Sequence, residues 1–333
     1  MHLFVAIPTF NRNDKLFQCV KRLLPQLTPE CHLFILDNAS DVPVAQTLAP
    51  LLEQFPDVPV ELSRNRVNIG ANANIMRCLE KCEAPWIWMV GDDDWVKEDA
   101  ISTILEATSK HPDAVLLNFS VDDARTTPTI TRGLEELMDV ASPSADLPWI
   151  ANSVYRIEAM LPHLKMGYHY ITSMLPHVVT MLCAVGERGQ CALLPQQIVD
   201  GRDRHLLAED SSTWSLVPLA LGVPLVQDLP VSPRVRRAFG QKLLAYPIKL
   251  EFVVYQLLLL SIRHKNPEGA YYLYDQIVRR GYPFGGTPKE RAMRLFYRFL
   301  LRFPSLTAVA FYALKRRRFG SIGTQFKDFY GRI

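Results

Sequence analysis

The feature that most restricts the fold is a regular alternation of short apolar runs with helical patterns over the first 120 residues. Each apolar run has the length of a strand, and each intervening segment repeats its apolar residues along one helical face. The expected strands are 3–8, 32–36, 58–62, 86–90 and 114–119, and the expected helices are 14–27, 44–55, 71–82 and 99–109. Alternating strands and helices imply parallel crossovers, so the sequence predicts an α/β fold whose sheet is flanked by helices.

The rest of the chain is less regular. Residues 121–148 are rich in Asp, Thr, Pro and Ser, and we expect a surface excursion there. A strand over 153–156, a helix over 171–185 and a strand over 191–194 are expected to complete the sheet. Further helices are expected at 213–221, 241–264, 267–280, 289–303 and 306–318. The sequence therefore predicts a sheet domain over 1–205 and a helical region over 206–333.

The net charge of +3 conceals a strong asymmetry along the chain. Residues 1–230 carry 17 Lys and Arg against 29 Asp and Glu, whereas residues 231–333 carry 20 against 5. This division predicts an acidic catalytic half and a basic half that meets an anionic partner. Charge alone leaves a phospholipid surface, a pyrophosphate-linked acceptor and nucleic acid open.

We expect the protein to be cytoplasmic. Met1 and His2 run directly into an apolar strand, without the basic segment and cleavage site of a secretory signal. The six cysteines show no CxxC pair and no zinc-binding spacing, so buried reduced thiols are expected. The apolar stretch 252–262 is shorter than the roughly 20 residues that a spanning helix needs. Helices of the basic region are instead expected to lie on an anionic membrane surface.

Three consecutive aspartates, Asp92, Asp93 and Asp94, follow the expected strand 86–90. Crowded carboxylates repel one another unless a cation neutralises them, and hard oxygen ligands suit Mg²⁺ or Mn²⁺. Such a metal is typically shared with the phosphates of a nucleotide. A solvated acidic turn, or an N-cap for the helix that begins near residue 99, is the alternative.

Polar residues also follow the other strands, at the edge where α/β sheets bind ligands. Asp37 and Asn38 follow the second strand, and a carboxylate there can accept the imide N–H of uracil or thymine. Asp-Asn is also an ordinary turn pair. Asn68, Gly70 and Asn74 lead into the third helix, where glycine permits close backbone approach and the helix N-terminus favours negative charge. Turn and cap chemistry explains these residues equally well.

Taken in order, these segments resemble glycosyltransferase family 2, whose members have the GT-A fold. Residues 7–12 resemble the opening strand motif, residues 36–40 the nucleotide-base motif, residues 68–74 the Asn-x-Gly helix, and residues 88–95 the DxD strand. The resemblance is specific over 3–110, weaker to about 205, and absent beyond. Within the family the chain is most similar to abequosyltransferase-like enzymes that build bacterial O-antigen, capsule or other surface polysaccharides.

The resemblance implies an inverting, metal-dependent transfer of a sugar from a nucleotide-sugar donor to a glycan or polyprenyl-diphosphate-linked acceptor. It implies Mn²⁺ or Mg²⁺ as cofactor, no nucleic acid partner, and a place on the inner face of the plasma membrane. Residues 1–205 would be the catalytic domain, and 206–333 would meet the acceptor or the membrane. The implied donor-binding residues are Pro8, Thr9, Asn11, Arg12, Asp37, Asn38, Asn68, Gly70, Asn74, Asp92, Asp93 and Arg202. The implied metal ligands are Asp93, Asp94 and His205.

Two departures from the family pattern matter. Gly91 stands where the family commonly has the first Asp of Asp-x-Asp-Asp, so Asp93 and Asp94 match the metal and ribose positions. The family's Glu-Asp pair, which supplies the general base, is matched only by residues 209–210, past the last strand. The family's spacing falls instead on His177, whose imidazole has an unperturbed pKa near 6.5. His177 and Asp210 are the two main candidates for the base; His169, or no side-chain base at all, remains open, and a helical histidine can also be structural.

Two rival functions remain. A sugar nucleotidyltransferase needs a glycine-rich loop and a lysine soon after the first strand, and residues 8–11 provide neither. A noncatalytic glycan- or membrane-binding protein that retains the GT-A fold is favoured by the two departures.

Overall fold

The computed structural model describes residues 1–121, 125–141, 147–200, 228–245, 267–281 and 288–303, together with the single positions 222, 225, 254 and 257. The chain forms two compact units. The first comprises Met1–Arg204 and Val231–Ala238, and the second comprises His205–Pro230 and Phe239–Ile333. The functional division between 1–205 and 206–333 stays a prediction.

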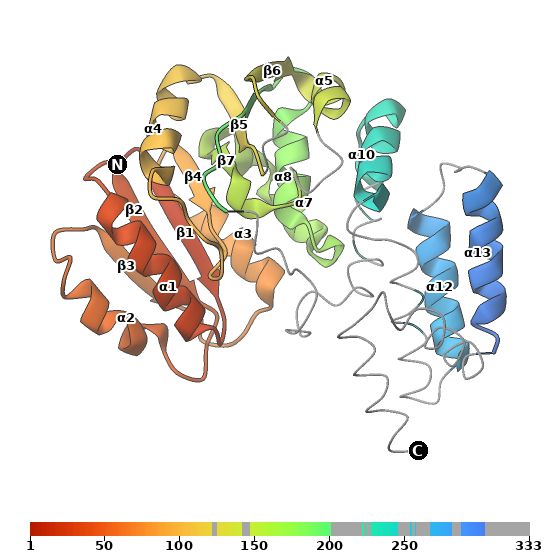
Figure 1. Cartoon of the computed structure of the whole chain (residues 1–333), viewed down its shortest axis with the longest axis horizontal. Helices are drawn as coiled ribbons and strands as arrows, with labels where there is room; N and C mark the ends of the chain where they lie inside the picture. Colours follow the sequence, from red (N-terminus) through yellow and green to blue (C-terminus); the bar gives the residue numbers. More distant parts are fainter. Residues whose placement is uncertain are drawn as a thin grey trace. The chain divides into compact units, whose positions relative to one another are not determined.

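Within the described residues, the first unit is built on an eight-stranded sheet of order β3-β2-β1-β4-β7-β5-β8-β6 (Figure 1). The strands are β1 (Leu3–Thr9), β2 (Cys31–Asp37), β3 (Val60–Arg64), β4 (Trp86–Met89), β5 (Ala114–Phe119), β6 (Thr129–Arg132), β7 (Ser153–Arg156) and β8 (Gln190–Leu194). Strands β1 to β4 pair in parallel, β5 pairs in parallel with β8, and β7 and β6 run against their neighbours. The carboxyl ends of β2, β1 and β4 therefore lie side by side.

Helices cover both faces of this sheet. They are α1 (Asn13–Leu23), α2 (Val44–Leu52), α3 (Ala71–Lys81), α4 (Ala100–Lys110), α5 (Gly133–Val140), α6 (Ile157–Met160), α7 (Leu164–His169) and α8 (Pro176–Val185), with short 3₁₀ turns at Leu24–Gln26, Ile150–Asn152, Leu161–His163 and Ile171–Ser173. Helices α1, α2 and α4 bury their apolar faces in one core with the side chains of Leu3, Val5 and Ile7 from β1. Helix α3 packs against β1 and against α7 and α8. The predicted α/β class, with a mixed sheet flanked by helices, is confirmed.

The prediction of a surface excursion over 121–148 is wrong for the described part of that stretch. Strand β6 pairs antiparallel with β8, and α5 buries Leu134, Leu137 and Met138. The turn-forming residues around these short elements dominate the composition, so the three apolar residues of α5 are obscured in the sequence.

The predicted helix over 171–185 is also interrupted. Residues 171–173 form a 3₁₀ turn, and Met174 takes a left-handed conformation with φ 65°. Helix α8 starts only at Pro176, which suits the first position of a helix because its missing N–H is not needed there.

In the second unit the structure describes α12 (Pro267–Gly281) and α13 (Pro288–Leu300), while α10 (Pro233–Ala245) has its first residues in the first unit and its last residues in the second. Tyr274 donates a hydrogen bond of 2.7 Å to the carbonyl of Arg294, which joins α12 to α13. The helices expected at 213–221 and 306–318, and most of 241–264, lie outside the described residues. Among the residues that the structure describes, none forms a helix long and apolar enough to cross a bilayer.

Candidate active site

The acidic cluster lies where β4 ends, directly beside the end of β1. Asp92 is buried, and its Oδ2 accepts a hydrogen bond of 2.7 Å from the hydroxyl of Thr9. Arg12 donates to the Oδ1 of Asp92 over 3.2 Å. Burial raises the pKa of Asp92, and the contacts with Thr9 and Arg12 oppose that rise. The structure thus joins three of the residues that the sequence predicted for donor binding.

Asp93 is the exposed member of the cluster. Its side chain is 45% exposed, and its Oδ2 lies 3.0 Å from Arg12 Nη1 and 3.8 Å from Lys15 Nζ. Arg12 therefore bridges the two aspartates, and a second cation faces the accessible one. Sequence reasoning missed Lys15, although its place three residues after Arg12, at the start of a helix, puts the two side chains on one face.

Asp94 is partly buried and turns back toward the main chain. Its Oδ2 accepts a hydrogen bond of 2.7 Å from the N–H of Gly91, and its carboxylate also accepts one from the side chain of Trp149. The pKa of Asp94 is raised to about 7, chiefly by burial; the charges of Asp93 and Asp92 add to the rise, and the hydrogen bonds from Gly91 and Trp149 oppose it. Sequence reasoning missed Trp149, which directly follows the stretch expected to be a surface excursion.

Two of the three carboxylates, those of Asp93 and Asp94, are the candidates for a divalent cation that arrives with a diphosphate. Mg²⁺ usually takes only one or two protein carboxylates and completes its shell with water and substrate phosphates. Across the described ranges, no group of three or more His, Cys, Asp and Glu side chains is arranged to hold a metal ion. The donor set fits Mg²⁺ or Mn²⁺ in this shared mode.

Arg202, His205 and Asp210 lie outside the described residues. The last described residues before them, Val199 and Asp200, contact the residues that follow the acidic cluster. The N–H of Asp200 donates a hydrogen bond of 2.8 Å to the carbonyl of Trp95, and Val199 pairs with Val96. Asp200 is thus anchored next to the residue that follows the cluster.

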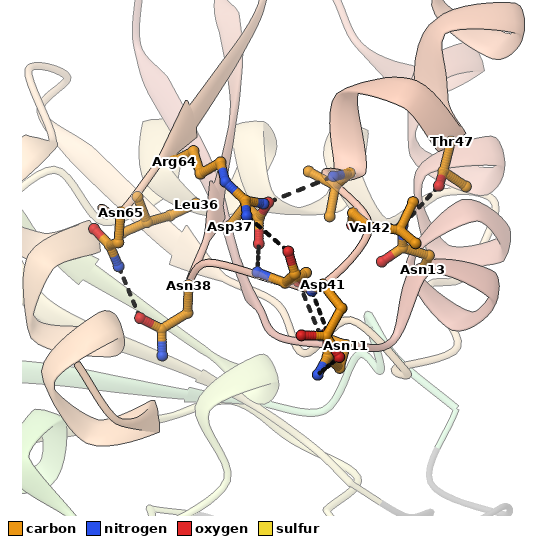
Figure 2. A network of polar contacts seen from close by, with 12 residues as sticks. Asn11, Asn13, Leu36, Asp37, Asn38, Asp41, Val42, Thr47, Arg64 and Asn65 are labelled. Atoms are coloured by element: carbon orange, nitrogen blue, oxygen red, sulfur yellow. Dashed lines mark hydrogen bonds and ion pairs between the residues drawn. The ribbon is translucent and has the colours of Figure 1, made fainter. Parts of the chain in front are cut away.

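The loop after β2 is held by the carboxylate of Asp37, which is buried (Figure 2). Its Oδ1 accepts a hydrogen bond of 2.8 Å from the N–H of Ser40, and its Oδ2 lies 3.4 Å from the N–H of Val44. Arg64 forms an ion pair with Oδ2 and donates to the carbonyl of Ser40. Asp37 and Arg64 occupy paired positions at the ends of β2 and β3, a register that the separate sequence segments did not predict.

The asparagines predicted for donor binding form an internal network. Asn38 donates to Asn68 over 2.8 Å and accepts from Asn65 over 2.9 Å (Figure 2 shows the second contact). Asn74 is buried, accepts from Asn65 and donates to the carbonyl of Leu36. These side chains fix the loops at the ends of β2 and β3 and the start of α3.

The loops after β1 and β2 are also tied to each other. Asn11, at φ 53°, accepts a hydrogen bond of 2.7 Å from the N–H of Asp41 and donates from its Nδ2 to the Asp41 carboxylate. Gly70, at φ +86°, caps the start of α3, and this conformation favours glycine over other residues. Pro8 lies within β1, one residue before the loop.

His177 lies under the surface at the start of α8. Its Nε2 is 3.1 Å from the carbonyl of Pro148, which can only accept, so Nε2 carries the proton and donates. Its Nδ1 is buried and has no hydrogen-bond partner among the described residues. Burial lowers the pKa of His177 to about 4. The imidazole is therefore neutral, and its role as general base stays a prediction.

Part of the chain matches a known protein family. Residues 4–155 match the family described as Glycosyl transferase family 2. No curated protein matches the chain. The matched segment takes in the acidic cluster and Trp149, whereas His177 lies beyond it.

Solved structures share the fold. The crystal structure of S. aureus TarS 1–349 has a TM-score of 0.56 at 12% identity, covering 92% of this chain and 88% of that chain. The same protein in complex with UDP-GlcNAc has a TM-score of 0.57 at 13% identity, and in complex with UDP 0.55 at 14%, with the same coverage. At these identities the likeness shows the fold alone, and the predicted GT-A fold is confirmed.

Proposed function

We propose that this protein is a glycosyltransferase that binds a nucleotide-sugar donor at the carboxyl ends of β1, β2 and β4. It transfers the sugar, with inversion, to a glycan or polyprenyl-diphosphate-linked acceptor in the synthesis of bacterial surface polysaccharide. The observation that carries this proposal is the convergence of Asp92 and Asp93 on Thr9 and Arg12 at adjacent strand ends. The family match over the same residues, and the UDP-GlcNAc bound to a protein of the same fold, support it.

The acidic cluster would hold the diphosphate end of the donor. Asp93 and Asp94 would hold Mn²⁺ or Mg²⁺, which would stabilise the charge of the nucleotide leaving group. Asp93 is suited to this because it is the most exposed of the three carboxylates. Asp92 has a different part: its bonds to Thr9 and Arg12 join the loop after β1 to the loop after β4. Arg12 and Lys15 supply positive charge beside the expected place of the diphosphate.

The base of the donor would lie near Asp37 and Asn38, with Asn11, Asn68, Gly70 and Asn74 shaping the surrounding loops. A carboxylate offers about four acceptor positions. Internal donors from Ser40, Val44 and Arg64 take three of those of Asp37, so at most one position is left for an imide N–H, on a side chain that is 1% exposed.

Two residues remain candidates for the general base. His177 has a buried, unpartnered Nδ1 among the described residues, and an acceptor hydroxyl must reach that atom for the imidazole to take its proton. Asp210 is the second candidate. Arg202 and His205 would assist at the diphosphate and the metal, and the bond between Asp200 and Trp95 supports this because it starts their segment beside the cluster.

The second unit would dock on an anionic membrane surface. Leu295, Phe299 and Phe303 recur every four residues on and just after α13, and they are 67%, 62% and 50% exposed. Arg298 and Arg302 are exposed beside them at helical spacing. An apolar helical face with a basic rim is typical of helices that lie in the membrane interface.

The catalytic proposal is tested by thermal-shift measurements with a panel of nucleoside diphosphates, with and without Mn²⁺. We expect one base to raise the melting temperature strongly, with Mn²⁺ enhancing the effect. The corresponding nucleotide sugar should then be hydrolysed slowly, and more slowly still by Asp93→Asn than by the control Asp57→Asn, which changes an exposed carboxylate far from the cluster in sequence. A protein that neither binds nor turns over any donor would support the noncatalytic alternative.

Membrane docking is tested by flotation with vesicles of phosphatidylglycerol and phosphatidylcholine. Phe299→Ser and Leu295→Ser should lower the bound fraction, since each loses an exposed apolar side chain from the same face. Val140→Ser is the control, because Val140 is an exposed apolar residue of α5 in the first unit. Equal flotation of all these variants, or no preference for anionic vesicles, would contradict docking through α13.

A further inference from the structure

Position 91 has room for glycine only while the Asp94 side chain stays where it is. A Cβ added to Gly91 would lie 2.7 Å from Oδ2 and 3.2 Å from Cγ of Asp94, and 3.4 Å from Oδ1 of Asp93. Gly91 is not among the residues with a positive φ. The requirement at this position is therefore space for the carboxylate of Asp94, not an unusual backbone conformation.

The Asp94 carboxylate is held in that space from two sides. The N–H of Gly91 donates to Oδ2 over 2.7 Å, and the main-chain N–H of Asp94 donates to the Gly91 carbonyl over 3.2 Å. These two bonds close residues 91–94 into a tight turn. From the other side comes the side-chain hydrogen bond of Trp149, whose only donor is its indole N–H.

Trp149 is itself fixed by the elements around it. Its ring packs against the core that α1, α2 and α4 share with the sheet. The preceding carbonyl, of Pro148, accepts the hydrogen bond of His177 on α8. Two residues later, the carbonyl of Ala151 accepts a hydrogen bond of 2.7 Å from the indole of buried Trp88 on β4. The indole N–H of Trp149 therefore approaches Asp94 from a segment anchored at both ends.

We propose that Trp149 and Gly91 are positioning residues that set the direction of the Asp94 carboxylate. The three neighbouring aspartates then have different partners: Asp92 contacts Thr9 and Arg12, Asp93 contacts Arg12 and Lys15, and Asp94 contacts Gly91 and Trp149. This inference rests on the proposed function in one respect, namely that Asp94 acts on the metal-bound diphosphate. It also gives Gly91 a role: any side chain at position 91, including the Asp common in the family, would displace the carboxylate of Asp94.

The first experiment needs no ligand. In ¹H–¹⁵N NMR spectra, the indole resonance of Trp149 is identified by its loss in Trp149→Phe. We expect that resonance to move in Gly91→Ala and in Asp94→Asn, because both change the carboxylate that accepts its proton. Tyr168→Phe is the matched control, since it also removes an aromatic donor to a carboxylate, that of Glu80. An indole resonance unmoved in both Gly91→Ala and Asp94→Asn overturns the proposal.

The second experiment measures Mn²⁺-dependent binding of the nucleoside diphosphate that the wild-type protein prefers. Trp149→Phe and Gly91→Ala should each weaken it at least tenfold, and Gly91→Asp should weaken it as well. Binding of the nucleoside diphosphate without metal should change less than twofold in Trp149→Phe. A variant that had lost its fold would lose this binding too, so the comparison separates the two cases. In an Asp94→Asn background, Trp149→Phe should add no further loss, because both changes act through the same carboxylate.

The outcomes separate the two proposals. Wild-type binding in Trp149→Phe, or an undiminished effect of Trp149→Phe in the Asp94→Asn background, overturns the positioning role. If instead the wild-type protein binds no nucleoside diphosphate while the indole resonance responds as expected, the proposed function fails and the positioning of Asp94 stands.

Discussion

Replacing His177 by Gln should remove a large part of the dependence of stability on pH. Burial lowers the pKa of His177 from 6.5 to about 4 in the folded protein. In the unfolded chain the imidazole takes up a proton near pH 6.5, whereas the folded protein takes it up only near pH 4. Because the unfolded state binds more protons between these values, the free energy of unfolding falls as the pH is lowered through that window.

The size of the effect follows from the two pKa values. One pKa unit corresponds to about 1.36 kcal/mol, so the drop to about 4 amounts to about 3 kcal/mol when complete. As the pH falls from 6.5 toward 4, the free energy of unfolding of the wild-type protein should therefore decrease by up to about 1.4 kcal/mol per pH unit more than that of His177→Gln. Gln keeps an N–H that can donate to the Pro148 carbonyl and does not titrate.

Urea unfolding followed by circular dichroism at pH 7, 6, 5 and 4.5 measures this difference. His111→Gln serves as the control, because His111 is only partly buried, at the end of α4. The reasoning is refuted if the free energy of unfolding depends on pH in the same way in wild-type protein and in His177→Gln. An NMR titration that gives His177 a pKa near 6.5 would refute it as well. The rate of sugar transfer by His177→Gln gives complementary information. Loss of a general base typically lowers the rate 10²–10⁴-fold, whereas loss of a structural histidine lowers it much less.

Three further predictions concern the charges and the core. Asp93→Asn should weaken Mn²⁺-dependent donor binding at least tenfold in calorimetry, while leaving the melting temperature nearly unchanged because the side chain is exposed. Arg64→Met should lower the free energy of unfolding by about 2 kcal/mol, since it leaves the buried carboxylate of Asp37 without its ion-pair partner. The cost stays below that of a fully buried pair because Arg64 is 40% exposed. A loss below about 0.5 kcal/mol in urea unfolding would count against this prediction. Leu16→Ala should cost about 2–5 kcal/mol, because Leu16 is fully buried in the core between α1 and the sheet; an unchanged unfolding midpoint would contradict that packing.

The sequence predicted the parts of the candidate site that depend on strand ends. Once β1, β2 and β4 are recognised as parallel strands, their following residues must gather at one edge of the sheet, and Thr9 meets Asp92 there. Arg64 could not be placed in the same way. Its contact with Asp37 depends on the register between β2 and β3, which apolar periodicity leaves undetermined.

Trp149 was missed for a related reason. It follows a stretch whose composition favours turns, and nothing local in the sequence connects it with residues 91–94. Only the antiparallel insertion of β7 between β4 and β5 brings the segment before β7 to the end of β4. A side chain delivered by such an insertion lies outside any pattern of neighbouring residues.

Gly91 shows how a motif can mislead when it is compared position by position. Compared with the family motif, the sequence has Gly91 in place of an Asp, and this loss of a carboxylate favoured the noncatalytic alternative. In the structure the absent Cβ leaves the space into which Asp94 turns, 2.7 Å from the main-chain N–H at position 91. A carboxylate is thus still present beside that position, supplied by a residue three places later. The departure from the family motif therefore gives no ground for preferring the noncatalytic alternative, and that choice depends on donor binding instead.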